Sequence, residues 1–144
     1  MGVTWCVEAW LLHHWLFDSG FQALIGSRKE DLVDNWEMDS LFGKFAYLVN
    51  HLPEWLLPEG FNIKKHRMSM KLLNPENGNA IIGESANDNF ARQGRYSAIF
   101  LDEFAFWDWP GSVWTGTADA SKFRIAVSTP NFDNTFSKFR HSGS

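Results

Sequence analysis

The longest apolar stretch of the chain covers residues 5–17, where Glu8, His13 and His14 are the main polar interruptions. Its length favours a helix over a strand. Because apolar residues occur nearly all round the predicted helix, we expect it to be buried on more than one side. Asp18, Ser19 and Gly20 follow and predict the end of the helix.

Shorter apolar runs predict strands. Runs that are apolar throughout are typical of strands buried on both faces of a sheet. A turn at residues 74–78, which contains Asn-Gly, should join two of them as a hairpin because this pair tolerates positive φ. The pattern therefore predicts an α/β protein with helices on both faces of its sheet. The apolar runs cover residues 21–26, 80–84, 96–101 and 124–128, and residues 68–73 alternate well enough for a further strand.

Helical spacing returns after residue 40, where apolar residues recur three or four positions apart up to Leu52. Asp39 or Ser40 could cap this helix, and Pro53 should end it. A shorter helix is predicted after Ser27, which has Glu30 three residues later in the pattern of a capping box.

Composition narrows the class of protein. A chain of 144 residues, 44% of them hydrophobic, has the size of one ordered domain. With 8 Trp and 13 Phe it is rich in large apolar side chains, and we expect some of these to face a further domain or a partner. A net charge of −4 argues against a protein whose only task is to hold DNA, so any DNA contact should be local or supplied by other subunits.

Cysteine use and hydropathy bear on the compartment. Cys6 is the only cysteine, which excludes an internal disulfide and fits a reducing, cytoplasmic environment. No apolar run approaches the roughly 18 to 20 residues of a membrane span. The first residues also lack the basic segment of a secretory signal.

The first candidate for chemistry is the strand 99–101 with Asp102 and Glu103 directly after it. Ligands of open α/β sheets bind at the carboxyl ends of the strands. Phosphoryl transfer from ATP needs one carboxylate for Mg²⁺ and a second group to orient the attacking water. Adjacent carboxylates at a strand end can supply both. The alternative is an acidic pair that only begins a solvated loop.

Two weaker motifs flank this strand. Gly2, Val3 and Thr4 precede the first helix as Gly-Lys-Ser/Thr does in a P-loop, but Val3 stands in the place of the lysine. An ordinary N-terminus is the alternative. The strand at residues 126–128 runs into Thr129, Pro130 and Asn131, polar positions that could sense a γ-phosphate, although a simple turn explains them better on local grounds.

Six blocks, in order and over almost the whole chain, carry a family resemblance: residues 28–34, 39–44, 52–58, 74–78, 99–107 and 128–131. They resemble the ATPase domain of tailed-phage terminase large subunits. The resemblance implies a P-loop NTPase fold (RecA/ASCE-like), with a mostly parallel sheet that is incomplete at the N-terminus. Residues 1–144 would be a partial ATPase domain, with the end of Walker A at 1–4, Walker B at 98–103 and a coupling motif at 126–131.

The resemblance also implies a function. Terminase large subunits form a homo-oligomeric ring at the procapsid portal and hydrolyse ATP to package double-stranded DNA. The implied cofactors are ATP and Mg²⁺. The implied partners are double-stranded DNA, the portal protein and the small terminase subunit, in the cytoplasm of a bacterial host.

Roles follow for single residues from the same resemblance. Gly2 and Thr4 would close the Walker A loop, with Thr4 on Mg²⁺. Asp102 would be the Walker B metal ligand and Glu103 the catalytic carboxylate. An arginine acting on the nucleotide of a neighbouring subunit would be Arg92, which fits the spacing better, or Arg95; the alternative is that both are solvated loop residues. The coupling motif would consist of Ser128, Thr129 and Asn131.

The chain also departs from the family pattern. Val3 replaces the usual lysine, and we expect the strand and glycine-rich loop before Met1 and the nuclease domain after Ser144 to be missing. A truncated or decayed prophage gene, or an excised domain, would explain this, and we expect the chain alone to hydrolyse ATP poorly. The alternatives are an inactive remnant that binds packaging partners through exposed aromatic residues, and another P-loop motor of the helicase-like kind.

Overall fold

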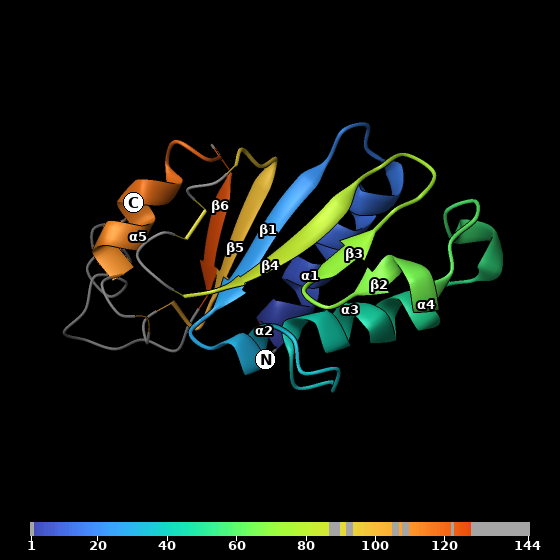
Figure 1. The fold of residues 1–144 in the computed structure, drawn as a ribbon, viewed down its shortest axis with the longest axis horizontal. Coiled ribbons are helices and arrows are strands. Elements are labelled where there is room, and N and C mark those ends of the chain that lie inside the picture. Colours follow the sequence, from blue (N-terminus) through green and yellow to red (C-terminus); the bar gives the residue numbers. More distant parts are fainter. Residues whose placement is uncertain are drawn as a thin grey trace.

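A computed structural model describes residues 2–86, 90–91, 94–104, 107, 110–121 and 123–127. These residues form a six-stranded sheet in the order β2-β3-β4-β1-β5-β6 (Figure 1). The four strands on the β6 side of the sheet are mutually parallel, and β2 and β3 are joined to them as antiparallel strands. The predicted mixed α/β fold with a mostly parallel sheet is therefore confirmed. The strands are β1 (Gln22–Ser27), β2 (Arg67–Met68), β3 (Lys71–Leu73), β4 (Ala80–Ser85), β5 (Ala98–Asp102) and β6 (Arg124–Val127).

Helices cover both faces of the sheet, as predicted. Successive side chains of a strand point to opposite faces. On β1, Ile25 accordingly packs in a core with the helices α1 (Gly2–Phe17) and α3 (Leu41–Asn50). Leu24 packs in a second core with α5 (Pro110–Thr117). Phe100 and Leu101 of β5 divide between the two cores in the same way.

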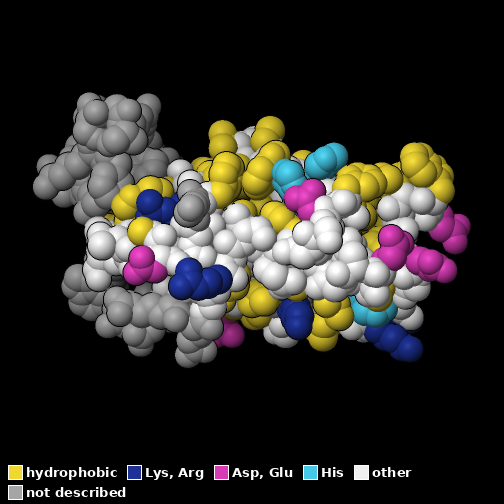
Figure 2. All heavy atoms as spheres, turned by 90° about the horizontal axis from the view of Figure 1, so that it is seen from above, with side chains coloured by type: hydrophobic (Ala, Val, Ile, Leu, Met, Phe, Trp, Pro, Cys, Tyr) yellow, Lys and Arg dark blue, Asp and Glu magenta, His cyan; other side chains and the backbone are white. Residues whose placement is uncertain are grey.

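Helix α1 is longer and less enclosed than the sequence indicates. It begins at Gly2, and its buried residues are Thr4, Glu8, Leu11, Leu12 and Trp15. The prediction of burial on more than one side was wrong, because Val3, Trp10 and Phe17 are exposed on the side away from the sheet. Trp10 stacks on Phe123 with ring centroids 4.8 Å apart. Figure 2 shows hydrophobic side chains exposed in several groups on the face it displays.

The second long helix and the hairpin turn form as predicted. Ser40 caps α3, and its hydroxyl oxygen accepts a hydrogen bond from the backbone N–H of Gly43 at 3.1 Å. The turn at residues 74–78 joins β3 to β4, with Gly78 at φ +80. Asn74 and Asn79 also donate to the backbone oxygen of Trp15, so this turn ties the end of α1 to the sheet. The shorter helices are α2 (Glu30–Val33), α4 (Ile63–His66) and the 3₁₀ helix η1 (Glu54–Leu56).

Two local predictions were wrong. Ser27 does not cap α2; it is the last residue of β1, paired with Ser85, and the cap position is Lys29 without a side-chain hydrogen bond. The parallel ladder with β4 extends the strand past the point where local sequence predicts a helix start. The run 68–73 is divided between β2 and β3, which form a tight hairpin with Met70 at φ +59. Among the described residues, no helix is long and apolar enough to cross a membrane.

Candidate active site at the carboxyl edge of the sheet

The first turn of α1 lies beside the carboxyl end of β5. The hydroxyl Oγ1 of Thr4 donates a hydrogen bond to Oδ1 of Asp102 at 3.3 Å, joining residues 98 positions apart in the sequence. Thr4 is buried and Asp102 is partly buried. Because Asp102 follows Phe100 by two residues, both side chains lie on the α1 side of the sheet. Two residues picked out separately in the sequence are thus in contact.

The charge state of Asp102 reflects its partial burial. Burial raises the pKa of this carboxyl, and the neighbouring charge of Glu103 raises it further. The hydrogen bond from Thr4 and the positive charge of Lys44 act in the opposite direction, but the pKa remains raised. The indole Nε1 of Trp107 donates to the backbone oxygen of Asp102 at 2.9 Å, which fixes the strand end. Asp102 is therefore a rigidly held carboxyl that a nearby cation would stabilise in its charged form.

Glu103 points to a different partner. Its carboxylate Oε2 accepts a hydrogen bond from Nε of Arg28 at 2.9 Å, and both side chains are 42% exposed. Its backbone lies in the left-handed region at φ +52, which is uncommon for residues other than glycine. The two adjacent carboxylates consequently leave the strand in different directions. Asp102 faces the beginning of α1, whereas Glu103 lies at the surface beside Arg28, which directly follows β1.

Further buried polar groups lie in the same layer. Glu8 is 0% exposed, and neither of its carboxyl oxygens has a hydrogen-bond partner among the described residues. Ser27 is equally buried, and its hydroxyl also lacks a partner there. Since Gly26 is paired with Leu101, the parallel register places Ser27 next to Asp102. The described edge therefore combines two carboxyls and two hydroxyls on its α1 side.

The structure does not bring the other predicted site residues into contact with Thr4 and Asp102. Gly2 is exposed at the first position of α1, and an added Cβ there would meet no atom within 4 Å. Arg95 lies before β5, towards the opposite end of that strand from Asp102, so it does not reach this site within the same chain. Arg92, Ser128, Thr129 and Asn131 lie outside the described residues.

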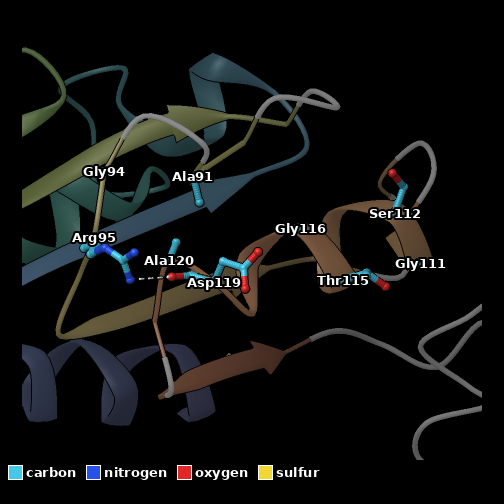
Figure 3. A pocket seen from close by; sticks show the side chains of 9 residues that line it. All are labelled: Ala91, Gly94, Arg95, Gly111, Ser112, Thr115, Gly116, Asp119 and Ala120. Carbon is cyan, nitrogen blue, oxygen red and sulfur yellow. Dashed lines mark hydrogen bonds between the residues drawn. The ribbon is translucent and has the colours of Figure 1, made fainter.

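A cavity between the segment before β5 and helix α5 lies elsewhere. It has a volume of about 960 Å³ and contains none of Thr4, Asp102 or Glu103. Figure 3 shows Arg95 pointing towards Asp119 across this cavity, and its Nη1 donates to the backbone oxygen of Asp119 at 3.3 Å. The cavity is therefore separate from the acidic edge. Its lining residues are Ala91, Gly94, Arg95, Gly111, Ser112, Thr115, Gly116, Asp119 and Ala120.

Comparison with known proteins identifies the fold. The structure superimposes with a TM-score of 0.66 on a mutant of the large terminase ATPase domain from a Thermus phage, at 17% sequence identity. The match covers 96% of this chain and 59% of that one, so the chain spans about three fifths of the solved domain. The chain shares the fold of a terminase ATPase domain. No protein-family model matches it, and no curated protein does.

The side chains at the edge suit Mg²⁺. Thr4 and Asp102 offer hard oxygen donors 3.3 Å apart, the kind of ligand that Mg²⁺ prefers. Within the described part of the chain, no three His, Cys, Asp or Glu side chains converge as a cation cage. A site with few protein ligands is characteristic of Mg²⁺ that is held largely by water and substrate phosphates. The donor set is thus compatible with the cation implied by the terminase resemblance.

Two residues of this edge were not selected from the sequence. Arg28 was noted only within a block of resemblance, although its position at the end of the first strand could have placed it at the carboxyl edge. Glu8 carries a clearer signal, because it is the only Asp, Glu, Lys or Arg in a helix of 16 residues. A single acid in an otherwise apolar helix is expensive to bury and therefore indicates a specific environment.

Proposed function

We propose that the chain is the ATP-hydrolysing motor part of a viral terminase large subunit, which uses ATP and Mg²⁺ to drive double-stranded DNA into a procapsid. The observation that carries the proposal is the contact between Thr4 and Asp102 at the carboxyl edge of a sheet with the terminase ATPase fold. A hydroxyl at a helix start and a carboxylate at a strand end are the two groups that hold Mg²⁺ in P-loop enzymes.

In this proposal Asp102 and Thr4 hold the cation, which neutralises charge on the phosphates when bound. Glu103 orients and deprotonates the attacking water. In the structure Glu103 is held by Arg28 at 2.9 Å, so its carboxylate must leave or share that partner to reach a water. Such an exposed ion pair is weak, about 0 to 1 kcal/mol, so it presents only a small barrier to this movement. Arg28 therefore holds the carboxylate near the edge without locking it in place.

The remaining roles belong to the proposal through the terminase resemblance. Gly2 closes the phosphate loop, Ser128, Thr129 and Asn131 couple hydrolysis to movement, and Arg92 acts on the nucleotide of a neighbouring subunit in the ring. The DNA, portal and small-subunit contacts follow in the same way. Arg95 is the weaker candidate for the arginine in trans, because its guanidinium is engaged with the backbone of Asp119.

A binding and turnover experiment tests the proposal. Fluorescent ATP is titrated into the chain with and without Mg²⁺, and phosphate release is measured in parallel. Wild type should bind Mg·ATP and turn it over slowly, Asp102→Asn should lose the effect of Mg²⁺ on binding, and Glu103→Gln should bind normally but lose the residual turnover. Glu54→Gln, an exposed acid in η1 far from the edge, is the matched control and should behave as wild type.

The same titration separates the second candidate function. Exposed aromatic residues, with Trp55 at 83% exposure, favour a non-catalytic role in which the chain binds packaging partners. Absence of Mg·ATP binding in wild type would favour that role and would refute the ATPase proposal. Equal turnover in wild type and Glu103→Gln would exclude Glu103 as the catalytic carboxylate.

A further inference from the structure

The most unusual buried group of the described structure is the carboxyl of Glu8. It is 0% exposed, and both oxygens lack a hydrogen-bond partner among the described residues. Protonation alone does not satisfy it, because a neutral carboxylic acid gains an O–H donor that then needs an acceptor. Buried polar groups in folded proteins are nearly always hydrogen-bonded, and exceptions call for a specific explanation such as an absent ion or water.

The position of Glu8 links it to the candidate active site. It lies one helical turn after Thr4, and residues four apart on a helix share a face. Both side chains are buried on the sheet side of α1, where Thr4 donates to Asp102. The charge of Asp102 also acts on the Glu8 carboxyl and, with burial as the larger cause, raises its pKa. Glu8 therefore lies behind the pair formed by Thr4 and Asp102.

The positive charge nearby does not provide a partner. Lys44 on α3 lowers the pKa of Glu8, but less than burial raises it. The ammonium Nζ of Lys44 instead donates to the backbone oxygen of Asp39 at 3.2 Å and lies 6.0 Å from the centre of the Trp5 ring. Ser27 adds a second buried hydroxyl without a partner beside Asp102. Among the described residues, this side of the sheet thus holds buried oxygen atoms that no hydrogen bond satisfies.

We propose that Glu8 is a further oxygen ligand, directly or through a water molecule, of the divalent cation that binds at Thr4 and Asp102. The inference rests on the proposed function, because it concerns the same cation. A divalent cation would satisfy the two orphaned oxygens and would compensate the repulsion between Glu8 and Asp102. It would also connect the body of α1 to the end of β5 in the bound state.

Manganese binding to the full 144-residue chain tests this inference without relying on turnover. Free Mn²⁺ is measured by electron paramagnetic resonance, with and without ATP. Glu8→Gln should weaken Mn²⁺ binding by about 10- to 100-fold, the range typical for loss of a group that supports a metal site. Glu8→Asp should recover part of the affinity because it keeps the carboxylate. Glu54→Gln removes the same charge at a distant exposed position and should bind as wild type.

Thermal unfolding separates a cation ligand from a structural residue. In metal-free buffer Glu8→Met, which replaces an unsatisfied carboxyl by an apolar chain of similar length, should raise Tm by about 3 to 10 °C. A given concentration of Mn²⁺ should raise the Tm of wild type more than that of this variant. If Glu8→Met and Glu8→Gln both lower Tm and weaken Mn²⁺ binding together, Glu8 is only structural and the inference is overturned.

The outcomes for Asp102 distinguish this inference from the proposed function. If Asp102→Asn loses Mn²⁺ binding while Glu8→Gln keeps the wild-type affinity, the role of Glu8 is refuted and the ATPase proposal stands. If wild type binds no Mn²⁺ with or without ATP, or if neither substitution changes its affinity, the cation site itself is wrong and both proposals fail.

Discussion

The protein buries two carboxyl groups in opposite ways. Asp34, at the end of α2, accepts hydrogen bonds from both terminal nitrogens of Arg67, at 2.6 and 2.7 Å, and from the backbone N–H of Met70 at 2.8 Å. The side chains of this ion pair are 1% and 3% exposed, respectively. Glu8, in α1, is just as buried but has no such partner among the described residues. One carboxyl is fully satisfied and the other is not, although both lie in the same small domain.

The difference separates structural from functional burial. The network of Asp34 joins the end of α2 to β2 and to the turn between β2 and β3, on the other side of β4 and β1 from β5 in the sheet order. The guanidinium of Arg67 also stacks on the Trp36 ring at 3.8 Å. Everything that this carboxylate needs is supplied by the fold. Glu8 lies next to the pair formed by Thr4 and Asp102, and its requirements are left unmet. A group that destabilises the folded chain in this way is expected at a site that binds something else.

The largest effect on stability should come from removing the satisfied carboxylate of Asp34. Asp34→Ala leaves the buried charge of Arg67 without its counter-ion and the backbone N–H groups of Met70 and Trp36 without their acceptor. The free energy of unfolding should therefore fall by about 3 to 5 kcal/mol. Urea unfolding measures it. Asp119→Ala, at an exposed position, should change stability by no more than about 0.5 kcal/mol. A loss below about 1 kcal/mol for Asp34→Ala would show that the network contributes little.

Replacing the unsatisfied carboxyl of Glu8 should raise, rather than lower, the free energy of unfolding. Glu8→Met removes a buried polar group without leaving a former partner unsatisfied, so the free energy of unfolding in metal-free buffer should rise by about 1 to 3 kcal/mol. Urea unfolding at pH 7 measures the gain, and Glu54→Met provides the exposed comparison. A loss of stability in Glu8→Met would mean that the carboxyl is satisfied in solution and would remove the contrast between the two regions.

The pH dependence should separate the two groups further. Burial by itself raises the pKa of Asp34, but the hydrogen bonds from Arg67, Met70 and Trp36 bring it below 3.8 overall. Its stabilisation is therefore present above that pH and is lost as the pH falls through the folded pKa. For Glu8, burial raises the pKa well above 4.5, so its contribution is most favourable below pH 4.5 and is lost as the pH rises towards the folded pKa.

The free energy of unfolding of wild type, Glu8→Met and Asp34→Ala, measured as a function of pH, tests the direction of both pKa shifts. The advantage of Glu8→Met over wild type should grow as the pH rises above 4.5, by up to about 1.4 kcal/mol per pH unit until the folded pKa is reached. The disadvantage of Asp34→Ala should shrink as the pH falls below 3.8. Parallel pH profiles for wild type and Glu8→Met would show that the pKa of Glu8 is not raised.

The smallest effect on stability should come from Glu103→Gln. Its ion pair with Arg28 is 42% exposed on both sides, so the free energy of unfolding should change by no more than about 0.5 kcal/mol. Under the proposed function the same substitution removes turnover. Arg28→Gln, which breaks the pair from the other side, should be equally mild in urea unfolding. A loss above about 2 kcal/mol in either variant would show that this pair stabilises the fold as the ion pair of Asp34 and Arg67 does.

Much of the fold could be predicted because buried strands, helix caps and turns have recognisable patterns of neighbouring residues. The runs of β1, β4 and β5 are recognisable, since strands covered on both faces are mostly apolar. The edge strand β6 keeps a short apolar run, although all four of its residues are partly exposed. Ser40 and the turn at residues 74–78 are also local, because a cap or a turn depends on a few neighbouring residues. Ser27 could not be placed in this way. Its pairing with Ser85 is a contact across 58 positions that local capping rules do not contain.

For the candidate site, too, some features depend on neighbouring residues and others on the packing of distant segments. The sequence by itself determined that Asp102 and Glu103 end a buried strand and that Thr4 begins a helix, because each statement needs only neighbouring residues. Only the tertiary structure brought Thr4 within 3.3 Å of Asp102, turned Glu103 towards Arg28, and left Glu8 buried without a partner. Whether a buried carboxyl is satisfied depends on donors from distant parts of the chain, and these are brought together by packing rather than by sequence neighbourhood.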